Sequence, residues 1–146
     1  MVAEALGNEV EWDPYLQGAS VTSAHADYDA EDLYWLSRII YAESGNQPLD
    51  GKIAVGNVVL NRVASPRFPN SVYEVIFQRN QFTPAANGSI NRTPSAESVV
   101  AAKLCLDGAN TAGSALYFVN PTVAPGSWAS RNRPYVATIG AHAFYG

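Results

Sequence analysis

The segment that decides the fold is Leu33-Tyr34-Trp35-Leu36-Ser37-Arg38-Ile39-Ile40-Tyr41-Ala42-Glu43-Ser44-Gly45, which predicts a helix with one apolar face. Leu33, Leu36 and Ile40 recur at the spacing that stacks side chains on one face, and Glu43 is the next residue in that row. Apolar neighbours disfavour the charged form of a carboxyl group, which raises its pKa and suits a general acid near neutral pH. We therefore expect Glu43 to lie partly buried near the helix end.

A second interpretation makes Glu43 an ordinary solvated residue of the last helical turn, because glutamate is seldom fully buried. Two features argue against it. A negative charge at a helix C-terminus is unfavourable with the helix dipole. Tyr34, Trp35 and Tyr41 also crowd this segment, as expected near a carbohydrate-binding cleft. On these residues alone both interpretations stay open.

The composition predicts one globular domain that binds a neutral or uncharged partner. The chain has 146 residues, of which 47% are hydrophobic, enough for a single core. Its net charge of -4 argues against nucleic acid as a partner, because phosphate binding needs clustered Lys and Arg. Cys105 is the single cysteine and lies in an apolar segment, so we expect a core residue and no internal disulfide.

Metal, cofactor and membrane binding are not expected. His25 and His142 are the two histidines, and neither belongs to a zinc-binding pattern, so we predict no metal and no cofactor. No run is long and apolar enough for a membrane span, so membrane insertion is not expected either. The first residues lack the basic end and apolar middle of a signal peptide, so we expect any export signal to lie upstream or to be absent.

The chain divides into an N-terminal arm or linker, residues 1–28, and a domain, residues 29–146. Helices are predicted after the caps Asp29 and Asp50, after the capping box Ser71 to Glu74, and from Thr93-Pro94 to Gly108. Strands are predicted at residues 115–119, 135–139 and 141–145. Helices followed by strands indicate an α+β fold with a small antiparallel sheet in the C-terminal part.

Five motifs in order resemble the catalytic domain of the spore-cortex-lytic cell-wall hydrolase family (SleB, with CwlJ as a relative). They are Ala42-Glu43-Ser44-Gly45-Asn46-Gln47-Pro48, residues 51–63, Gln81-Phe82-Thr83, Tyr117-Phe118-Val119-Asn120-Pro121 and residues 139–145. The resemblance implies a fold related to lysozymes and lytic transglycosylases and one catalytic glutamate, Glu43. It also implies peptidoglycan glycan strands as the partner, and action outside the cytoplasm, in the cell wall or in the spore cortex at germination. Ser44 stands where the family often has Ala.

The reaction that the resemblance implies is lytic transglycosylation between N-acetylmuramic acid and N-acetylglucosamine, which needs one carboxylate. Hydrolysis usually needs a second one. The other acids have structural explanations as caps, first-turn residues or exposed residues: Asp29, Asp50, Glu74, Glu97 and Asp107. The alternatives are a hydrolytic muramidase or glucosaminidase, and a peptidoglycan-binding module without activity. We expect a monomer.

Substrate contacts are predicted at seven further residues. Sugar faces stack on aromatic rings, while amides and hydroxyls bind the acetamido and hydroxyl groups. The predicted contacts are Ser44, Gln81, Phe82, Thr83, Tyr117, Asn120 and Trp128. Since neighbouring strand residues point to opposite faces, we expect only one of Tyr117 and Phe118 to face the sugar. His142 is expected to be structural.

Overall fold

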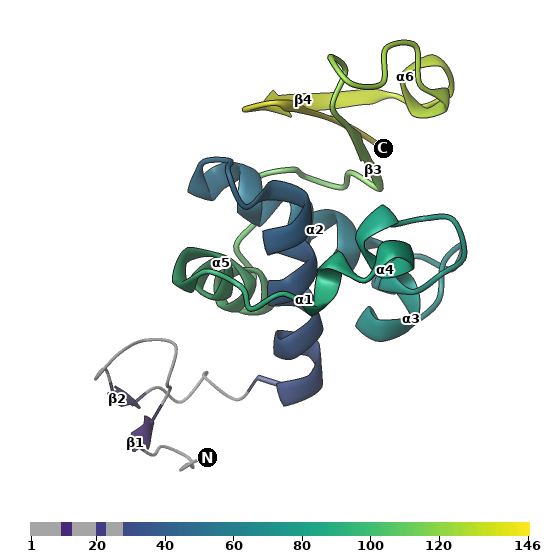
Figure 1. Cartoon of the computed structure of the whole chain (residues 1–146). Helices are drawn as coiled ribbons and strands as arrows, with labels where there is room; N and C mark the ends of the chain where they lie inside the picture. Colours follow the sequence, from purple (N-terminus) through teal and green to yellow (C-terminus); the bar gives the residue numbers. More distant parts are fainter. Residues whose placement is uncertain (1–9, 13–19, 23–27) are drawn as a thin grey trace.

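The computed structural model describes residues 10–12, 20–22 and 28–146 (Figure 1). Strands β1 (Val10–Trp12) and β2 (Ser20–Thr22) pair antiparallel. Most of the predicted arm, residues 1–28, and His25 lie outside the described residues, so the arm stays a prediction. The domain is built from α1 (Ala30–Ser44), α2 (Leu49–Ala64), α3 (Val72–Ile76), α4 (Thr83–Asn87), η2 (Ser89–Asn91), α5 (Ala96–Leu106), β3 (Tyr117–Val119), α6 (Trp128–Asn132), β4 (Tyr135–Ile139) and β5 (His142–Tyr145).

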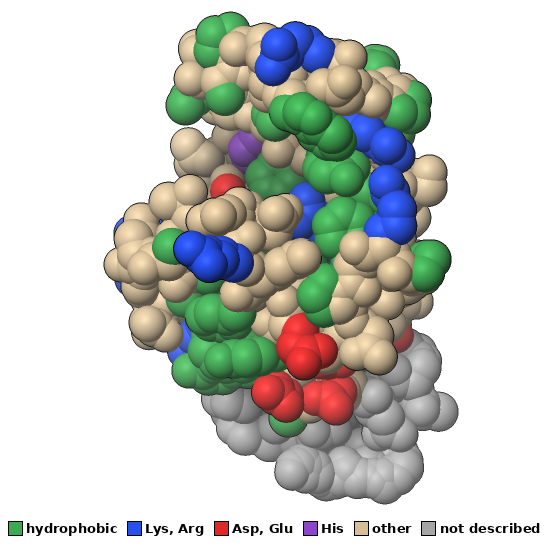
Figure 2. Space-filling model, turned by 90° about the vertical axis from the view of Figure 1, so that its right-hand side faces the viewer, with side chains coloured by type: hydrophobic (Ala, Val, Ile, Leu, Met, Phe, Trp, Pro, Cys, Tyr) green, Lys and Arg blue, Asp and Glu red, His purple; other side chains and the backbone are tan. Residues whose placement is uncertain are grey.

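The predicted α+β architecture is confirmed. Strands β3, β4 and β5 form an antiparallel sheet in the order β3-β5-β4, in which Phe118 pairs with Phe144. Figure 1 shows this sheet and α6 at one end of the molecule, with α1 to α5 packed beneath. On one face the space-filling view shows a hollow between the two parts (Figure 2).

Both ends of α1 lie where the sequence predicted them, at Asp29 and at Gly45. The Asp29 side chain accepts hydrogen bonds from the backbone N–H of Glu31 and Asp32 at 2.9 and 3.1 Å, which caps the helix. Gly45 keeps a right-handed φ of -56°, so the left-handed exit typical of glycine is not used. Pro48 is the N-cap of α2, so the prediction of Asp50 as that cap was wrong.

Other helix boundaries follow the same local chemistry. The capping box is confirmed, since the Ser71 hydroxyl accepts from the Glu74 N–H and donates to its carboxylate. Helix α5 begins at Ala96 rather than at Pro94, because Ser95 is the cap and accepts from the Ser98 N–H. The short helices α4 and α6 were not predicted, because each has too few residues to show a periodic pattern.

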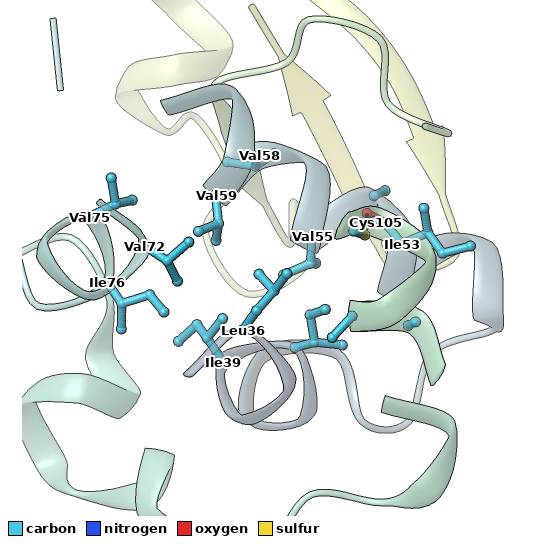
Figure 3. Close-up of a cluster of buried hydrophobic side chains, with 14 of the residues drawn as sticks. Leu36, Ile39, Ile53, Val55, Val58, Val59, Val72, Val75, Ile76 and Cys105 are labelled. Carbon is cyan, nitrogen blue, oxygen red and sulfur yellow. Dashed lines mark hydrogen bonds between the residues drawn. The ribbon is translucent and has the colours of Figure 1, made fainter. Parts of the chain in front are cut away.

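Helix α2 is the centre of the core, where α1, α3 and α5 pack against it (Figure 3). Its residues Gly51 to Val59 are all buried, in contact with residues such as Leu36 of α1 and Val72 of α3. A Cβ at Gly56 would lie 2.6 Å from the Cys105 sulfur, so this glycine allows α2 and α5 to approach. Cys105 is a core residue as predicted, and burial raises the pKa of its thiol to about 12.

Three side chains tie the sheet region to the helices. Asn61 of α2 donates to the carbonyl oxygens of Gly113 and Ala115 at 3.0 and 2.9 Å. The side-chain oxygen Oε1 of Gln47 accepts from the Ala141 N–H at 2.9 Å. Arg62 adds a bond to the residue before β3, described below. These bonds fix the sheet over the C-terminal end of α1, where Glu43 lies.

Candidate active site

Glu43 borders a hollow of about 430 Å³ between the helices and the sheet. It lies in the last turn of α1, one turn after the fully buried Ile39 and Ile40. Figure 2 shows acidic and histidine side chains inside the hollow. The side chains that line it come from α1, α2, α4, β3, α6 and β5 and the loops beside them: Glu43, Arg62, Gln81, Phe82, Thr83, Tyr117, Phe118, Val119, Asn120, Val123, Ala124, Ala129 and His142.

The Glu43 carboxyl group is electrostatically isolated. Burial raises its pKa from 4.5 to about 7, since desolvation disfavours the charged form. Within residues 28–146 no side chain or N–H hydrogen-bonds to this carboxylate or pairs with it. A carboxyl group with such a pKa is partly protonated at neutral pH and can donate a proton to a bound molecule.

No second carboxylate lines this hollow among the described residues. Glu97 pairs with the buried Lys52 at 2.8 Å, and Glu74 bonds to Ser71. Asp29 is a cap and Asp50 lies in the first turn of α2. Each of these acids has a structural role and none of them lines the hollow, so Glu43 is the single acid of the site among the described residues.

Arg62 is a buried cation that lines the same hollow. Its Nε donates to the Leu116 carbonyl at 2.8 Å and its Nη1 donates to Gln81 Oε1 at 3.1 Å. Burial lowers the pKa of the guanidinium to about 10, so it stays protonated at neutral pH. Its carbon lies 5.3 Å from the ring centres of both Phe82 and Tyr117. Arg62 therefore fixes a polar and an aromatic wall of the hollow.

Two amides line the hollow with their oxygens already bonded. Gln81 Oε1 accepts from Arg62, and Asn120 Oδ1 accepts from the N–H groups of Thr122 and Val123 at 3.0 and 3.3 Å. Neither side-chain NH₂ group has a partner in residues 28–146. Both amides thus have donors available for a bound molecule, which suits a ligand that carries carbonyl oxygens.

The structure brings together five of the seven predicted contact residues, together with Glu43. Gln81, Phe82, Thr83, Tyr117 and Asn120 line the hollow. Trp128 does not, but its ring is 5.6 Å from that of Tyr117 and it is 55% exposed, so it flanks the hollow.

Ser44 is not available for contact. It is fully buried and its hydroxyl donates to the Ile40 carbonyl at 2.7 Å. The prediction that Ser44 contacts the substrate is therefore wrong, because its side chain lies one turn after Ile40 on the buried face of the helix.

The aromatic side chains are arranged differently from the prediction. Tyr117 and Phe118 both border the hollow, although we expected one. Tyr117 reaches it on the side of Trp128, and Phe118 on the side of His142, whose ring is 5.2 Å away. Trp35 does not line the hollow; its ring centre lies 5.1 Å from that of Phe77, the residue after α3.

A second hollow of about 430 Å³ begins on the other side of Glu43. Its lining includes Tyr41, Asn46 and Arg92, whose guanidinium lies 5.9 Å from the Tyr41 ring. Glu43 belongs to the lining of both hollows. A chain-like molecule that crosses the protein here would therefore have binding space on either side of the acid.

Two polar residues of the site were missed or assigned differently. His142 was expected to be structural, but it lines the hollow; burial lowers its pKa, and its Nδ1 has no partner among the described residues. Arg62 was missed, although the sequence held a signal: it continues the apolar row of Val55, Val58 and Val59 on α2. The other lining residues that were missed are Val119, Val123, Ala124 and Ala129.

Potential metal ligands do not gather in the described part of the chain. In residues 10–12, 20–22 and 28–146 no three His, Cys, Asp or Glu side chains lie close enough to hold an ion together. The chemistry that these residues support is proton transfer by a single carboxyl group.

Known proteins resemble this chain over most of its length. It is 37% identical over 131 residues, 90% of this chain, to a spore cortex-lytic enzyme of Bacillus cereus, and 34% identical over 128 residues to that of Bacillus subtilis. It covers 49% and 42% of those two proteins, about half or less of their length.

Two solved structures also resemble this chain. The catalytic domain of the germination-specific lytic transglycosylase SleB from Bacillus anthracis matches with a TM-score of 0.75 and 38% identity, over 82% of this chain and 98% of that one. The catalytic domain of Bacillus cereus SleB gives the same TM-score over 92% of its length. The lysozyme and transglycosylase type of fold that the motifs implied is thereby confirmed. Residues 46–145 match the Cell Wall Hydrolase family, so this chain is a member of that family.

Proposed function

We propose that residues 29–146 form a catalytic domain that cleaves the glycan strands of peptidoglycan as a lytic transglycosylase. The observation that carries the proposal is Glu43: a carboxyl group with a pKa of about 7, alone among the described carboxylates in lining the hollow between the helices and the sheet, which is large enough for sugars. Membership of the family and the names of the relatives support the same substrate. The bond proposed for cleavage joins N-acetylmuramic acid to N-acetylglucosamine.

In the proposed reaction Glu43 acts first as the acid and then as the base. Its proton goes to the bridging oxygen as the bond to the anomeric carbon of N-acetylmuramic acid breaks. The cation at that carbon is held as an oxocarbenium ion or by the acetamido group of the same sugar. The Glu43 carboxylate then takes the proton of the 6-hydroxyl group, whose oxygen bonds to the anomeric carbon. The product ends in a 1,6-anhydro ring, and Glu43 is again protonated.

The single carboxylate favours this reaction over hydrolysis. An inverting hydrolase needs a second carboxylate about 6.5–9.5 Å away to activate water, and a retaining one needs it at about 5 Å. The described acids other than Glu43 line neither adjacent hollow. The 6-hydroxyl group belongs to the reacting sugar, so its attack has the advantage of an intramolecular reaction.

The remaining lining residues have roles in holding the sugars. The free NH₂ groups of Gln81 and Asn120 are suited to donate to acetamido carbonyls, and the Thr83 hydroxyl can donate or accept. Phe82, Tyr117 and the flanking Trp128 offer ring faces for sugar stacking. Hollows on both sides of Glu43 allow the strand to extend in both directions from the bond that is cut.

A binding module without activity is less well supported than an enzyme. Binding of neutral sugars does not require a desolvated carboxyl group, and burying one destabilises the fold once the pH exceeds the ordinary pKa of that group. Residues held against such a cost are typical of catalytic sites.

The place of action that we propose is the cell wall or spore cortex, because the relatives are named spore cortex-lytic enzymes. We further propose that the domain acts as a monomer, since the proposed reaction uses one carboxyl group, which a single copy of the chain supplies. None of the described helices is both long and apolar enough to cross a bilayer.

Purified sacculi test the proposal. The wild-type protein is expected to release soluble muropeptides, and Glu43→Gln is expected to release none while keeping its fold, since Gln has no proton to donate. Glu31→Gln is the matched control, because it removes an exposed carboxylate of the same helix that lines neither hollow. Near wild-type release by Glu43→Gln would overturn the assignment.

A further inference from the structure

Three arginines surround two aromatic rings at one edge of the main hollow. The Arg62 and Arg67 carbons lie 4.7 and 5.9 Å from the Phe68 ring centre. Arg62 and Arg133 lie 5.3 and 5.7 Å from the ring centre of Tyr117. The two rings are 6.1 Å apart and so join the three cations into one group. Figure 2 shows basic side chains beside apolar ones along this edge.

None of these three cations forms an ion pair with an acidic side chain among the described residues. Arg67 is exposed, and its side chain makes no hydrogen bond in residues 28–146. Arg133 uses its Nε to bond the Gly146 carbonyl, which leaves its outer NH₂ groups available. Guanidinium groups that stack on rings keep their N–H edges free for an anion.

The grouping of these three arginines is electrostatically unfavourable for the protein without a ligand. Like charges repel, and in a chain with a net charge of -4 acidic partners are plentiful. Two of these acids, Glu31 and Asp32, lie in the first turn of α1, at the opposite end of that helix from Glu43. Unpaired cations at the edge of a cleft create a positive potential that attracts anions toward it.

We propose that Arg67 and Arg133, the arginine rim, bind carboxylate groups carried by the substrate, with Arg62 adding positive charge behind them. The inference rests on the proposed function. The sugars of a glycan strand are uncharged at their hydroxyl and acetamido groups, so they offer these cations no ionic partner. The peptides attached to muramic acid end in free carboxylates, which a guanidinium binds through two parallel hydrogen bonds. The rim thus selects strands whose peptides carry free carboxylates and orients them beside Tyr117.

The test compares two substrates of the same size: native sacculi, and sacculi whose carboxylates are converted to methylamides. The wild-type protein is expected to cleave native strands at least about two-fold faster, since exposed charge pairs contribute modestly. Arg67→Gln, Arg133→Gln and the double variant should bring the ratio of the two rates toward one. Raising the salt concentration to about 0.5 M should do the same to the wild-type protein.

Arg79→Gln is the matched control, because it removes an exposed arginine outside both hollows and should keep the wild-type ratio. A wild-type ratio of one, or rim variants that keep the wild-type ratio, would show that the arginines only pack on the rings. If Arg133→Gln does not fold, Arg67→Gln decides, since its side chain makes no hydrogen bond. If neither substrate is cleaved, the proposed function is wrong. Sedimentation of the protein with each kind of sacculus then still tests whether the arginine rim binds carboxylates, because such binding predicts more protein in the pellet with native sacculi.

Discussion

Arg62 Nη1 donates to Gln81 Oε1 across 3.1 Å, and this bond links the central helix to the wall of the hollow. Gln81 is exposed and its long side chain would otherwise adopt many rotamers. Because Arg62 occupies the amide oxygen, the NH₂ group is the part of Gln81 left for a ligand. Arg62 is a positioning residue in this account: it is buried in the wall of the hollow and acts on a sugar through Gln81.

Gln81→Glu separates the two roles of this side chain. The new carboxylate would keep a partner in Arg62, so we expect thermal stability to be unchanged or higher. It would also remove the NH₂ donor and add a negative charge to the hollow that Glu43 borders, which raises the Glu43 pKa further. We expect cleavage to fall roughly ten-fold or more, measured as kcat and KM on soluble glycan fragments. A variant with wild-type kinetics would mean that Gln81 serves only to pair Arg62.

Glu43→Gln should change stability in a pH-dependent way. The folded pKa of about 7 exceeds the ordinary value of 4.5, so folding favours the protonated form. Wild-type stability is then fully present below pH 4.5, is lost as the pH rises from 4.5 to 7, and stays reduced above 7 by up to about 3 kcal/mol. Gln has no such penalty. The Tm of the variant should exceed that of the wild type at pH 8 and match it at pH 4.

The same titration should appear in activity. The rate of cleavage needs protonated Glu43 and should fall as the pH rises through about 7. Equal Tm differences at pH 4 and pH 8 would show that Glu43 ionises normally in the fold and would remove the main argument for its role.

Trp128→Ala should weaken binding more than folding. Its side chain is 55% exposed at the start of α6, so little buried area is lost. We expect weaker sedimentation with sacculi and a small change in Tm, with Tyr34→Ala, 44% exposed and outside both hollows, as the control. A loss of roughly 3–5 kcal/mol in the free energy of unfolding would place Trp128 in the core instead.

Chelators are expected to leave activity unchanged. The described residues hold no cluster of metal ligands, and the proposed reaction uses a carboxyl proton. Activity assays with and without EDTA check this. A large loss that one specific metal restores would contradict it.

Periodic patterns in the sequence were sufficient to predict the long elements. The apolar rows of α1 and α2 and the β-branched residues of β4 predicted their type, because burial of one face is strongly encoded over many residues. The boundaries of the helices were harder to predict than their type. Pro48 and Asp50 are both good residues for a helix start, and which one is the cap depends on how the chain leaves Gly45.

The site was predictable where a residue type was unusual in its place. Glu43 interrupts an apolar row, and so does Arg62, although only the first was recognised. Ser44 was misplaced because it was assigned to the site as the neighbour of Glu43, whereas its spacing of four residues from Ile40 puts it on the buried face of the helix. His142 reaches the hollow through the pairing of β5 with β3, a contact between distant segments that no local pattern encodes.

The most direct test of the central claim is mass spectrometry of the muropeptides that the domain releases from peptidoglycan. With Glu43 as the single carboxylate of the site, the account predicts ends of 1,6-anhydromuramic acid, lighter by one water than hydrolytic products and resistant to borohydride reduction. Reducible muramic acid ends as the main product would contradict the transglycosylase mechanism and require a group that activates water, while reducible N-acetylglucosamine ends would place the cut at the other glycosidic bond.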